Sequence, residues 1–263
     1  MSIIPLALVG LGTAAAYVTL VWLLSLVLKN ASIIDIFWAP GFAVLTVVYV
    51  LLSGDTYAGR EILVIVLVVT WALRLGGHIL TRNAGHGEDF RYKKWREAAG
   101  GSFWWVSLFR VFYLQGALLW IISAPLLVAV HSDSPDHLTV VDVIGVAVWS
   151  TGFLFEAIGD WQLTRFKANP DSTGKVMNVG LWRYTRHPNY FGDATLWWGY
   201  FIIAAGTAWG FVTVFAPAIM TFMLVRVSGV APLERSIKKR RPGYEEYIAR
   251  TSSFIPLPPK RSA

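Results

Sequence analysis

The sequence predicts an all-α, polytopic integral membrane protein whose seven transmembrane helices enclose one cavity open to the cytoplasm. Hydrophobic residues make up 55% of its 263 residues, and charged residues only 15%. A soluble domain rarely combines these two proportions. Seven separate apolar runs are also long enough for membrane helices, and Lys and Arg gather in alternate loops between them. Together these observations indicate a membrane-embedded bundle.

The apolar runs are each close to the length of about 20 residues that a bilayer-spanning helix needs. They are Ile3–Leu28, Ala31–Leu52, Ile62–Leu80, Val106–Val130, Leu138–Leu163, Tyr190–Ala205 and Phe211–Ser228. The first run lacks a basic start and continues as an anchor, so no cleavable signal peptide is expected. We predict one transmembrane domain over residues 1–263, in which residues 1–135 form the substrate side and residues 136–263 form the cofactor side and tail.

The distribution of Lys and Arg predicts the orientation in the membrane. Basic residues fill the loops 82–96 and 165–186 and the tail 238–241, whereas the loop 131–137 has none. With seven spans, all the basic segments fall on one side. The sequence therefore predicts a multi-pass protein of a bacterial inner membrane, with its N-terminus outside and its C-terminus in the cytoplasm.

The composition also argues against several classes of function. The net charge of +7 belongs mostly to the basic loops, and no nucleic-acid-binding motif accompanies it. The chain has no cysteine, and its five histidines are scattered, so we expect neither thiolate chemistry nor a metal site. No internal repeat of the transporter kind is visible. The expected partners are the lipid bilayer and a lipophilic small molecule, bound by a monomer.

Polar and ionisable side chains inside the predicted spans fall at one depth. In the seven-span orientation they lie in the cytoplasmic halves of six spans, as follows: Asp35, Arg74, His78, Arg110, Glu156, Asp160, Asn189, Asp193 and Arg226. Such groups are costly in lipid and usually mark a functional cavity. A salt bridge between Asp35 and Arg74 that merely packs two spans is the structural alternative for that pair. The common depth favours a polar pocket open to the cytoplasm.

The stretch Gly-Leu-Trp-Arg-Tyr-Thr-Arg-His-Pro-Asn-Tyr-Phe-Gly-Asp, residues 180–193, carries the most specific signal. Pro188 suits the first turn of a helix, where its missing N–H has no partner. Asn189 and Asp193, four residues apart, then project from one face. The stretch resembles the cofactor-side signature of the steroid 5α-reductase family, especially its bacterial homologues. Matching positions elsewhere are Asp160, Trp197, Gly199, Arg226, Tyr244, Tyr247 and Pro256.

The resemblance implies a membrane oxidoreductase. Its reaction would transfer a hydride from NADPH to the C=C bond of a conjugated enone, with a 3-oxo-Δ4 steroid as the expected substrate and 5α-reduction as the outcome. The implied site is not a Rossmann site, because no Gly-x-Gly-x-x-Gly motif follows a strand. The expected cofactor-binding residues are Arg74, His78, Arg82, Glu156, Asp160, Lys167, Leu181, Tyr184, Arg186, His187, Asn189, Tyr190, Asp193, Arg226, Glu234 and Arg235. Surplus basic residues, including Arg165 and Lys238, favour NADPH over NADH.

The expected catalytic residues lie in the N-terminal half. Asp35, desolvated in the membrane, is the preferred proton donor. Tyr92 is the alternative, from a loop that could fold over the pocket. Trp38, three residues after Asp35 on the same helix face, is expected to form the pocket wall. Where the reductases carry a Gln-Glu pair this chain has Ile34-Asp35, and the residue aligned with their span-three tyrosine is Trp71.

A methyltransferase is the alternative that the same residues leave open. Membrane methyltransferases of the isoprenylcysteine carboxyl methyltransferase type, which use S-adenosylmethionine, share the Arg-His-Pro-x-Tyr element and a tail similar to Gly243–Tyr247. Glu234 could then act as the glutamate that precedes their tail. Asn189, Gly192-Asp193 and Asp160 favour the reductase.

Overall fold

The computed structural model describes residues 1–54, 56, 58–227, 229–230, 234 and 243–260, and its regular structure there is helical. The one β-type pairing among these residues is an isolated bridge between Thr185 and Ser252. The chain forms two compact units. Unit 1 comprises Met1–Thr139 with Ala204–Thr213, and unit 2 comprises Val140–Ile203 with Val214–Ala263. The all-α class predicted from the sequence is confirmed.

Six helical runs in the described part of the chain are long and apolar enough to cross a membrane. They are Ile3–Val27, Ile33–Ser53, Ala58–Asn83, Phe90–Ile122, Val140–Ala168 and Gly210–Val227. The helix α9 (Pro188–Ala205), expected as the sixth span, is not among them. Its first turns carry Pro188, Asn189 and Asp193, which lower its hydropathy. The membrane character is confirmed, and the total of seven spans stays a prediction.

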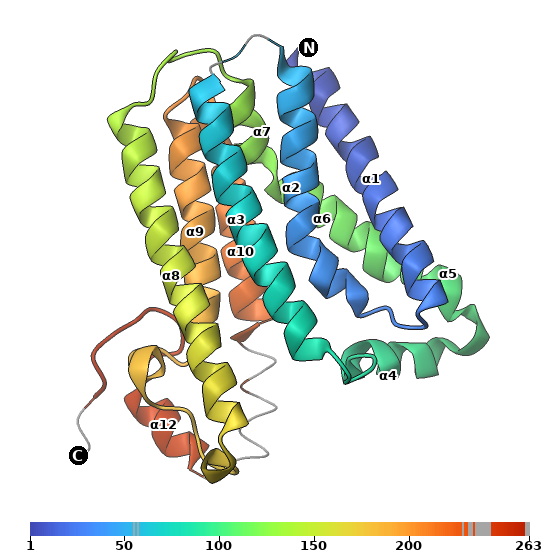
Figure 1. Cartoon of the computed structure of the whole chain (residues 1–263), viewed down its shortest axis with the longest axis vertical. Helices are drawn as coiled ribbons and strands as arrows, with labels where there is room; N and C mark the ends of the chain where they lie inside the picture. Colours follow the sequence, from blue (N-terminus) through green and yellow to red (C-terminus); the bar gives the residue numbers. More distant parts are fainter. Residues whose placement is uncertain (55, 57, 228, 231–233, 235–242, 261–263) are drawn as a thin grey trace. The chain divides into compact units, whose positions relative to one another are not determined.

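Three long helices form the frame of unit 1: α1 (Ile3–Val27), α2 (Ile33–Ser53) and α3 (Ala58–Asn83). Helix α2 packs against both α1 and α3, while α6 (Leu114–Ile122) packs on α1 and α7 (Ala124–His131) packs on α2 (Figure 1). Phe42, Tyr49 and Trp71 are completely buried. The core of unit 1 is therefore built around α2, the helix that carries Asp35.

The expected span Val106–Val130 is not one regular helix. It is divided into α5 (Phe103–Ser107), a π-helical segment η2 (Leu108–Tyr113), α6 and α7. The break before α7 falls at Ser123, because Pro125 lies in the first turn of the next helix and has no N–H to continue the previous one. Upstream, α4 (Phe90–Ala99) joins α5 through the 3-10 turn η1 (Gly100–Ser102). Gly100 has a φ of 55°, which glycine adopts without steric cost.

A buried arginine holds the far end of unit 1. Arg60, in the first turns of α3, has no exposed surface. Its guanidinium group donates hydrogen bonds of 3.0 Å to the carbonyl oxygens of Pro135 and His137. A buried guanidinium needs such acceptors, since an unsatisfied charge would cost several kcal/mol. Arg60 thus fixes the loop after α7 to the start of α3.

Unit 2 is organised by the close approach of α8 (Val140–Ala168) and α9. Glycines repeat every seven residues on both helices, at Gly145, Gly152 and Gly159 and at Gly192 and Gly199. A Cβ atom on Gly192 would lie 2.3 Å from the backbone nitrogen of Glu156 and 2.5 Å from the oxygen of Gly152. Only glycine allows this backbone contact. Further along α9, Trp198 Nε1 donates to Thr221 Oγ1 of α10 (Phe215–Phe222) over 3.2 Å.

Short elements complete unit 2: η3 (Pro170–Ser172), η4 (Gly180–Arg183), the π-helical η6 (Met223–Val227) and α12 (Tyr244–Arg250). The segment after α12 returns to the loop that precedes α9. Thr185 Oγ1 donates to the carbonyl of Phe254 over 2.8 Å, and the Leu257 amide donates to Tyr184 O over 3.0 Å. The C-terminal segment therefore supports the loop 180–187.

Candidate functional site

Two clusters of side chains, one in each unit, contain predicted site residues. The first, which we call the Asp35 cluster, consists of Asp35, Asp89, Arg91, Tyr92 and Gln115. The Asp35 carboxylate accepts a hydrogen bond of 2.6 Å from the Tyr92 hydroxyl and one of 2.9 Å from Arg91 Nη2. Asp35 lies in the first turn of α2 and Tyr92 in α4. The structure thus joins the two side chains that the sequence offered as alternative proton donors.

The loop before α4 holds Tyr92 in this position. The Asp89 side chain caps α4 by accepting from the Arg91 amide, and the Asp89 amide donates to Ser32 Oγ over 3.1 Å. Glu88 accepts two hydrogen bonds of 2.8 Å from Arg96 and one of 2.7 Å from the Ala31 amide. Burial raises the pKa of Glu88, but the hydrogen bonds from Arg96 and Ala31 outweigh burial and lower it. Glu88 and Asp89 therefore tie α4 to the start of α2.

Two further side chains flank this cluster. Gln115 Nε2 of α6 donates to the Tyr92 hydroxyl over 3.4 Å, so that oxygen both accepts and donates. Trp38, expected to line a pocket, lies half-buried one turn beyond Asp35 and contacts Phe42 edge to face at 5.0 Å. Arg91 and Gln115 were not among the predicted site residues. Arg91 could have been singled out because it precedes Tyr92 in the sequence. Gln115 could have been singled out as a polar residue near the start of the fourth predicted span.

The second group, the Glu234 cluster, consists of Arg186, His187, Tyr190 and Glu234. Glu234 Oε1 lies 2.7 Å from Arg186 Nε and 3.2 Å from His187 Nε2. Arg186 also donates to the carbonyl oxygens of Ile248 and Thr251. Burial raises the pKa of Glu234, but hydrogen bonds from His187 and Arg186 bring it down to about 2. Glu234 is therefore ionised at neutral pH and joins the 180–193 stretch to the tail.

His187 itself is almost fully enclosed, with 1% of its surface exposed. Its ring stacks on Tyr190 with a centroid distance of 5.6 Å and an interplanar angle of 13°. Because Nε2 faces Glu234, a neutral His187 carries its proton on Nε2. Nδ1 is buried and has no hydrogen-bond partner in the structure. His187 thus presents an acceptor nitrogen inside unit 2.

An amide–carboxylate pair lies beside the glycine contact between α8 and α9. Asn189 Nδ2 donates to Asp160 Oδ1 over 2.9 Å. Asp160, Glu156 and Asp193 are all buried, with 6%, 2% and 8% of their surfaces exposed. Gly159 lets Asn189 approach, since a Cβ there would lie 3.1 Å from the Asn189 nitrogen. Unit 2 therefore gathers buried acids where the sequence predicted cofactor-binding residues.

The remaining predicted cofactor residues are divided between the units. Arg74, His78 and Arg82 follow one another at steps of four residues along α3 in unit 1. Four others belong to unit 2. Lys167 lies in α8, Leu181 lies in η4 with Tyr184 directly after it, and Arg226 lies in η6. The Leu181 amide donates to Gln162 Oε1 over 3.0 Å. Arg235 and Lys238 lie outside the described residues.

A polar cleft of about 380 Å³ opens between the 176–183 segment and α12. Its lining includes Asn178, Arg183, Glu246 and Arg250, and the last two form an exposed ion pair of 3.3 Å. This cleft was not predicted from the sequence, because the residues that line it come from three separate segments. In the described part of the chain, no three ligating side chains are grouped so that they could hold a metal ion.

Comparison with known proteins gives a family but no described activity. The family described as "Protein of unknown function (DUF1295)" matches residues 21–251. An uncharacterized protein from Schizosaccharomyces pombe is 25% identical over 225 residues, which cover 75% of this chain and 64% of that protein. The chain thus spans less than two thirds of that relative's length. No solved structure matches. Because the match covers most of the sequence, the chain belongs to the DUF1295 family.

Proposed function

We propose that this protein is a membrane-embedded oxidoreductase that reduces the C=C bond of a conjugated enone in a lipophilic substrate with NADPH. A 3-oxo-Δ4 steroid is the proposed substrate class. The observation that carries the proposal is the Asn189–Asp160 pair, with its 2.9 Å hydrogen bond, inside the stretch that resembles the steroid 5α-reductase signature. The resemblance assigns cofactor binding to both residues.

The donor set of unit 2 fits a nicotinamide nucleotide. An amide and carboxylates can bind the carboxamide and ribose hydroxyls, and Asn189, Asp160 and Asp193 supply these groups. NADPH, when bound, supplies the hydride for the β-carbon of the enone. Arg226 and Lys167 would bind its phosphates, since guanidinium and ammonium groups pair well with phosphate oxygens.

The hydrogen bonds of the Asp35 cluster suggest how charge on the substrate is stabilised. As hydride reaches the β-carbon, the C=C electron pair moves toward the carbonyl oxygen, and a proton at the α-carbon completes the saturated ketone. A donor to that oxygen lowers the barrier, because the charge develops in the transition state. Asp35 accepts two hydrogen bonds, as a carboxylate does. We therefore assign the donor role to Tyr92 and an orienting role to Asp35.

The proposal includes the membrane arrangement predicted from the sequence. Helix α9 would be the sixth of seven spans, and the Asp35 cluster would face a cavity open to the cytoplasm. Lys and Arg in the loops 82–96 and 165–186 support a cytoplasmic position for these loops. The lipophilic substrate would then enter from the bilayer and the charged cofactor from the cytoplasm.

Ligand-induced stabilisation tests the proposal directly. Detergent-purified protein is heated with NADPH, NADH or S-adenosylmethionine, since a ligand that binds only the folded state raises the apparent Tm. We expect a concentration-dependent rise with NADPH, a smaller rise with NADH, and none with S-adenosylmethionine. The absence of a rise with both dinucleotides would overturn the reductase assignment.

The Glu234 cluster favours a methyltransferase as the second candidate. The methyltransferases that share the Arg-His-Pro-x-Tyr element also carry a glutamate before a similar tail. In this structure Glu234 contacts both Arg186 and His187 of that element. A rise of Tm with S-adenosylmethionine alone would support this function, and Glu234→Gln should then abolish the rise.

A further inference from the structure

Helix α4 differs from the long helices of unit 1 in direction and in composition. Five of its ten residues are charged, namely Arg91, Lys93, Lys94, Arg96 and Glu97. The apolar part of the Phe90–Ile122 run therefore follows α4. In unit 1, α4 runs across the end at which α1 ends, α2 begins and α3 ends (Figure 1). Helix α4 thus lies at the level where the apolar helices of this unit end.

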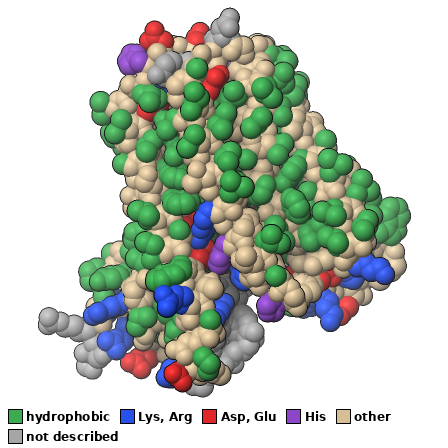
Figure 2. Space-filling view, in the orientation of Figure 1, with side chains coloured by type: hydrophobic (Ala, Val, Ile, Leu, Met, Phe, Trp, Pro, Cys, Tyr) green, Lys and Arg blue, Asp and Glu red, His purple; other side chains and the backbone are tan. Residues whose placement is uncertain are grey.

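The charges of α4 divide into a bound set and an exposed set. Arg91 pairs with Asp35 and Asp89, and Arg96 pairs with Glu88. Lys93, Lys94 and Glu97 are exposed, and within the described ranges no ion pair involves either lysine. Figure 2 shows Lys and Arg side chains at the lower right, where Figure 1 has α4 and α5. Two cations therefore remain available for an external anion.

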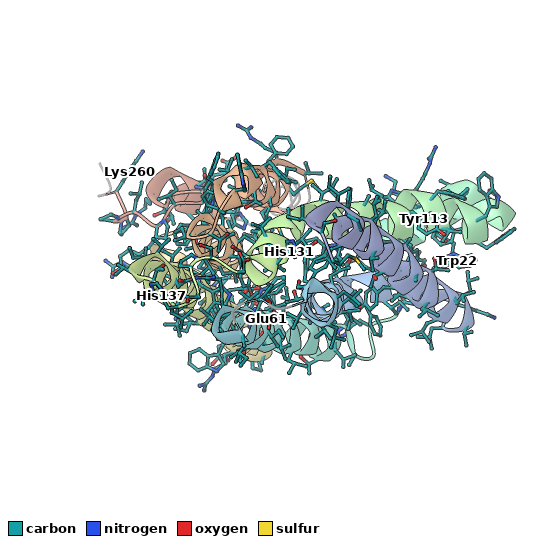
Figure 3. All side chains as sticks on the ribbon, turned by 90° about the horizontal axis from the view of Figure 1, so that it is seen from above. Trp22, Glu61, Tyr113, His131, His137 and Lys260 are labelled. Carbon is teal, nitrogen blue, oxygen red and sulfur yellow. The ribbon has the colours of Figure 1, made fainter. Side chains whose placement is uncertain are left out.

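Exposed aromatic side chains accompany these lysines on α4 and on α5, which follows it. Phe90, Trp95 and Trp104 have 73%, 52% and 56% of their surfaces exposed. Trp22 Nε1 of α1 donates to the Trp104 carbonyl over 2.9 Å, which fixes this segment to α1; Figure 3 labels Trp22 and the nearby Tyr113. Tryptophan beside lysine is typical of the membrane–water interface, where rings lie at headgroup level and ammonium groups reach phosphate.

We propose that α4 lies in the headgroup layer and that Lys93 and Lys94 bind anionic phospholipids there. The exposed aromatic rings would enter the boundary with the acyl chains. The opposite face of α4 carries Tyr92, whose side chain is buried against Asp35. A lipid contact on one face therefore bears on the position of the Asp35 cluster on the other. The proposal concerns the lipid partner and does not depend on the reductase assignment.

Because the chain has no cysteine, one introduced thiol gives a single labelled position. Ala98→Cys, at an exposed position of α4, is labelled with bimane and reconstituted into vesicles of phosphatidylcholine or phosphatidylglycerol brominated on their acyl chains. The quenching gives the binding constant of phosphatidylglycerol relative to phosphatidylcholine at that position. We expect a preference for phosphatidylglycerol of about fivefold for each lysine, weakened at about 1 M salt.

The matched variant adds Lys93→Gln and Lys94→Gln to the labelled chain, and the preference should fall close to one. A bimane at Leu8→Cys in α1, where Leu8 is 61% exposed, serves as the reference in the bilayer and should show no preference for phosphatidylglycerol. The proposal is overturned if neither lipid quenches the Ala98 label, which would place α4 in water. It is equally overturned if the preference survives the double substitution.

Discussion

The Tyr92 hydroxyl donates a hydrogen bond of 2.6 Å to the carboxylate of Asp35, joining residues that are 57 positions apart. The hydrogen bond connects the start of α2, which is apolar enough to span a membrane, to the polar helix α4. Arg91 donates to the other oxygen of the same carboxylate. With both oxygens engaged, Asp35 fixes the direction of the two donors. A substrate oxygen that displaces Asp35 from Tyr92 would find a donor already in place.

The first prediction concerns this pair. Tyr92→Phe should lower kcat for enone reduction by about 10²-fold, the usual size of a lost proton or hydrogen-bond donor. Asp35→Asn should lower kcat as well, because the direction of Tyr92 is lost. Neither substitution should change the Kd of NADPH, measured by titration of purified protein. Tyr113→Phe, also in unit 1, is the control, and an equal loss of kcat there would contradict the assignment.

Asn189 is the residue whose loss should weaken the cofactor. Asn189→Ala leaves the buried Asp160 carboxylate without its 2.9 Å donor. Hydrogen bonds to charged groups contribute about 1.5–3 kcal/mol, so we expect the Kd of NADPH to rise by roughly 10- to 100-fold. Asn169→Ala, in the exposed turn after α8, should leave the Kd unchanged. An unaltered affinity in Asn189→Ala would remove this residue from the cofactor site.

The glycine contact of unit 2 predicts a loss of stability. In Gly192→Ala the new methyl group would meet the backbone of α8 at 2.3 Å, and backbone atoms cannot turn aside. We expect the free energy of unfolding to fall by about 1–3 kcal/mol, seen as a lower Tm in detergent. Gly12→Ala in α1, where no heavy atom lies within 4 Å of the new Cβ, should keep or raise the Tm.

Glu234 predicts how stability depends on pH. Its pKa falls from an ordinary 4.5 to about 2 in the folded protein. A depressed carboxyl pKa stabilises the fold above the ordinary value, and this stabilisation is lost as pH falls from 4.5 toward 2. The shift corresponds to roughly 3 kcal/mol.

Thermal unfolding of the wild type and of Glu234→Gln measures this effect. The difference in Tm should be full at pH 7 and should shrink as pH is lowered below the ordinary carboxyl value. A difference that stays constant over this range would show that the substitution acts through shape rather than charge.

Hydropathy and local chemistry allowed much of this arrangement to be predicted. Apolar runs gave the long helices, because burial in lipid dominates their free energy. Pro188 was predicted to lie in the first turn of a helix, and it does begin α9. Tyr92 was the alternative donor, from a loop that could fold over the predicted pocket, and its hydroxyl does contact Asp35.

Other features depend on contacts that no local pattern specifies. Asp35 pairs with Arg91, whereas the structural alternative left open by the sequence paired it with Arg74 of the neighbouring span; the loop before α4 brings Arg91 to Asp35. The π-helical segment Leu108–Tyr113 and the break at Ser123 were hidden by continuous hydropathy, since membrane burial favours apolar residues whether or not the helix is regular. Arg60 read as a loop residue, because only the folded chain brings the carbonyls of Pro135 and His137 to it.

The return of residues 252–257 to the loop 180–187 has a consequence for biosynthesis. Thr185 pairs with Ser252, and the Tyr184 carbonyl accepts from the Leu257 amide. The hydrogen-bond partners of this loop are therefore synthesised more than sixty residues after it. Helix α8, which is long and apolar enough to cross a membrane, is complete well before this segment has been translated. The signature loop cannot take its final form until the segment that supports it has been synthesised. Maturation of the site is therefore a late event in the synthesis of the chain.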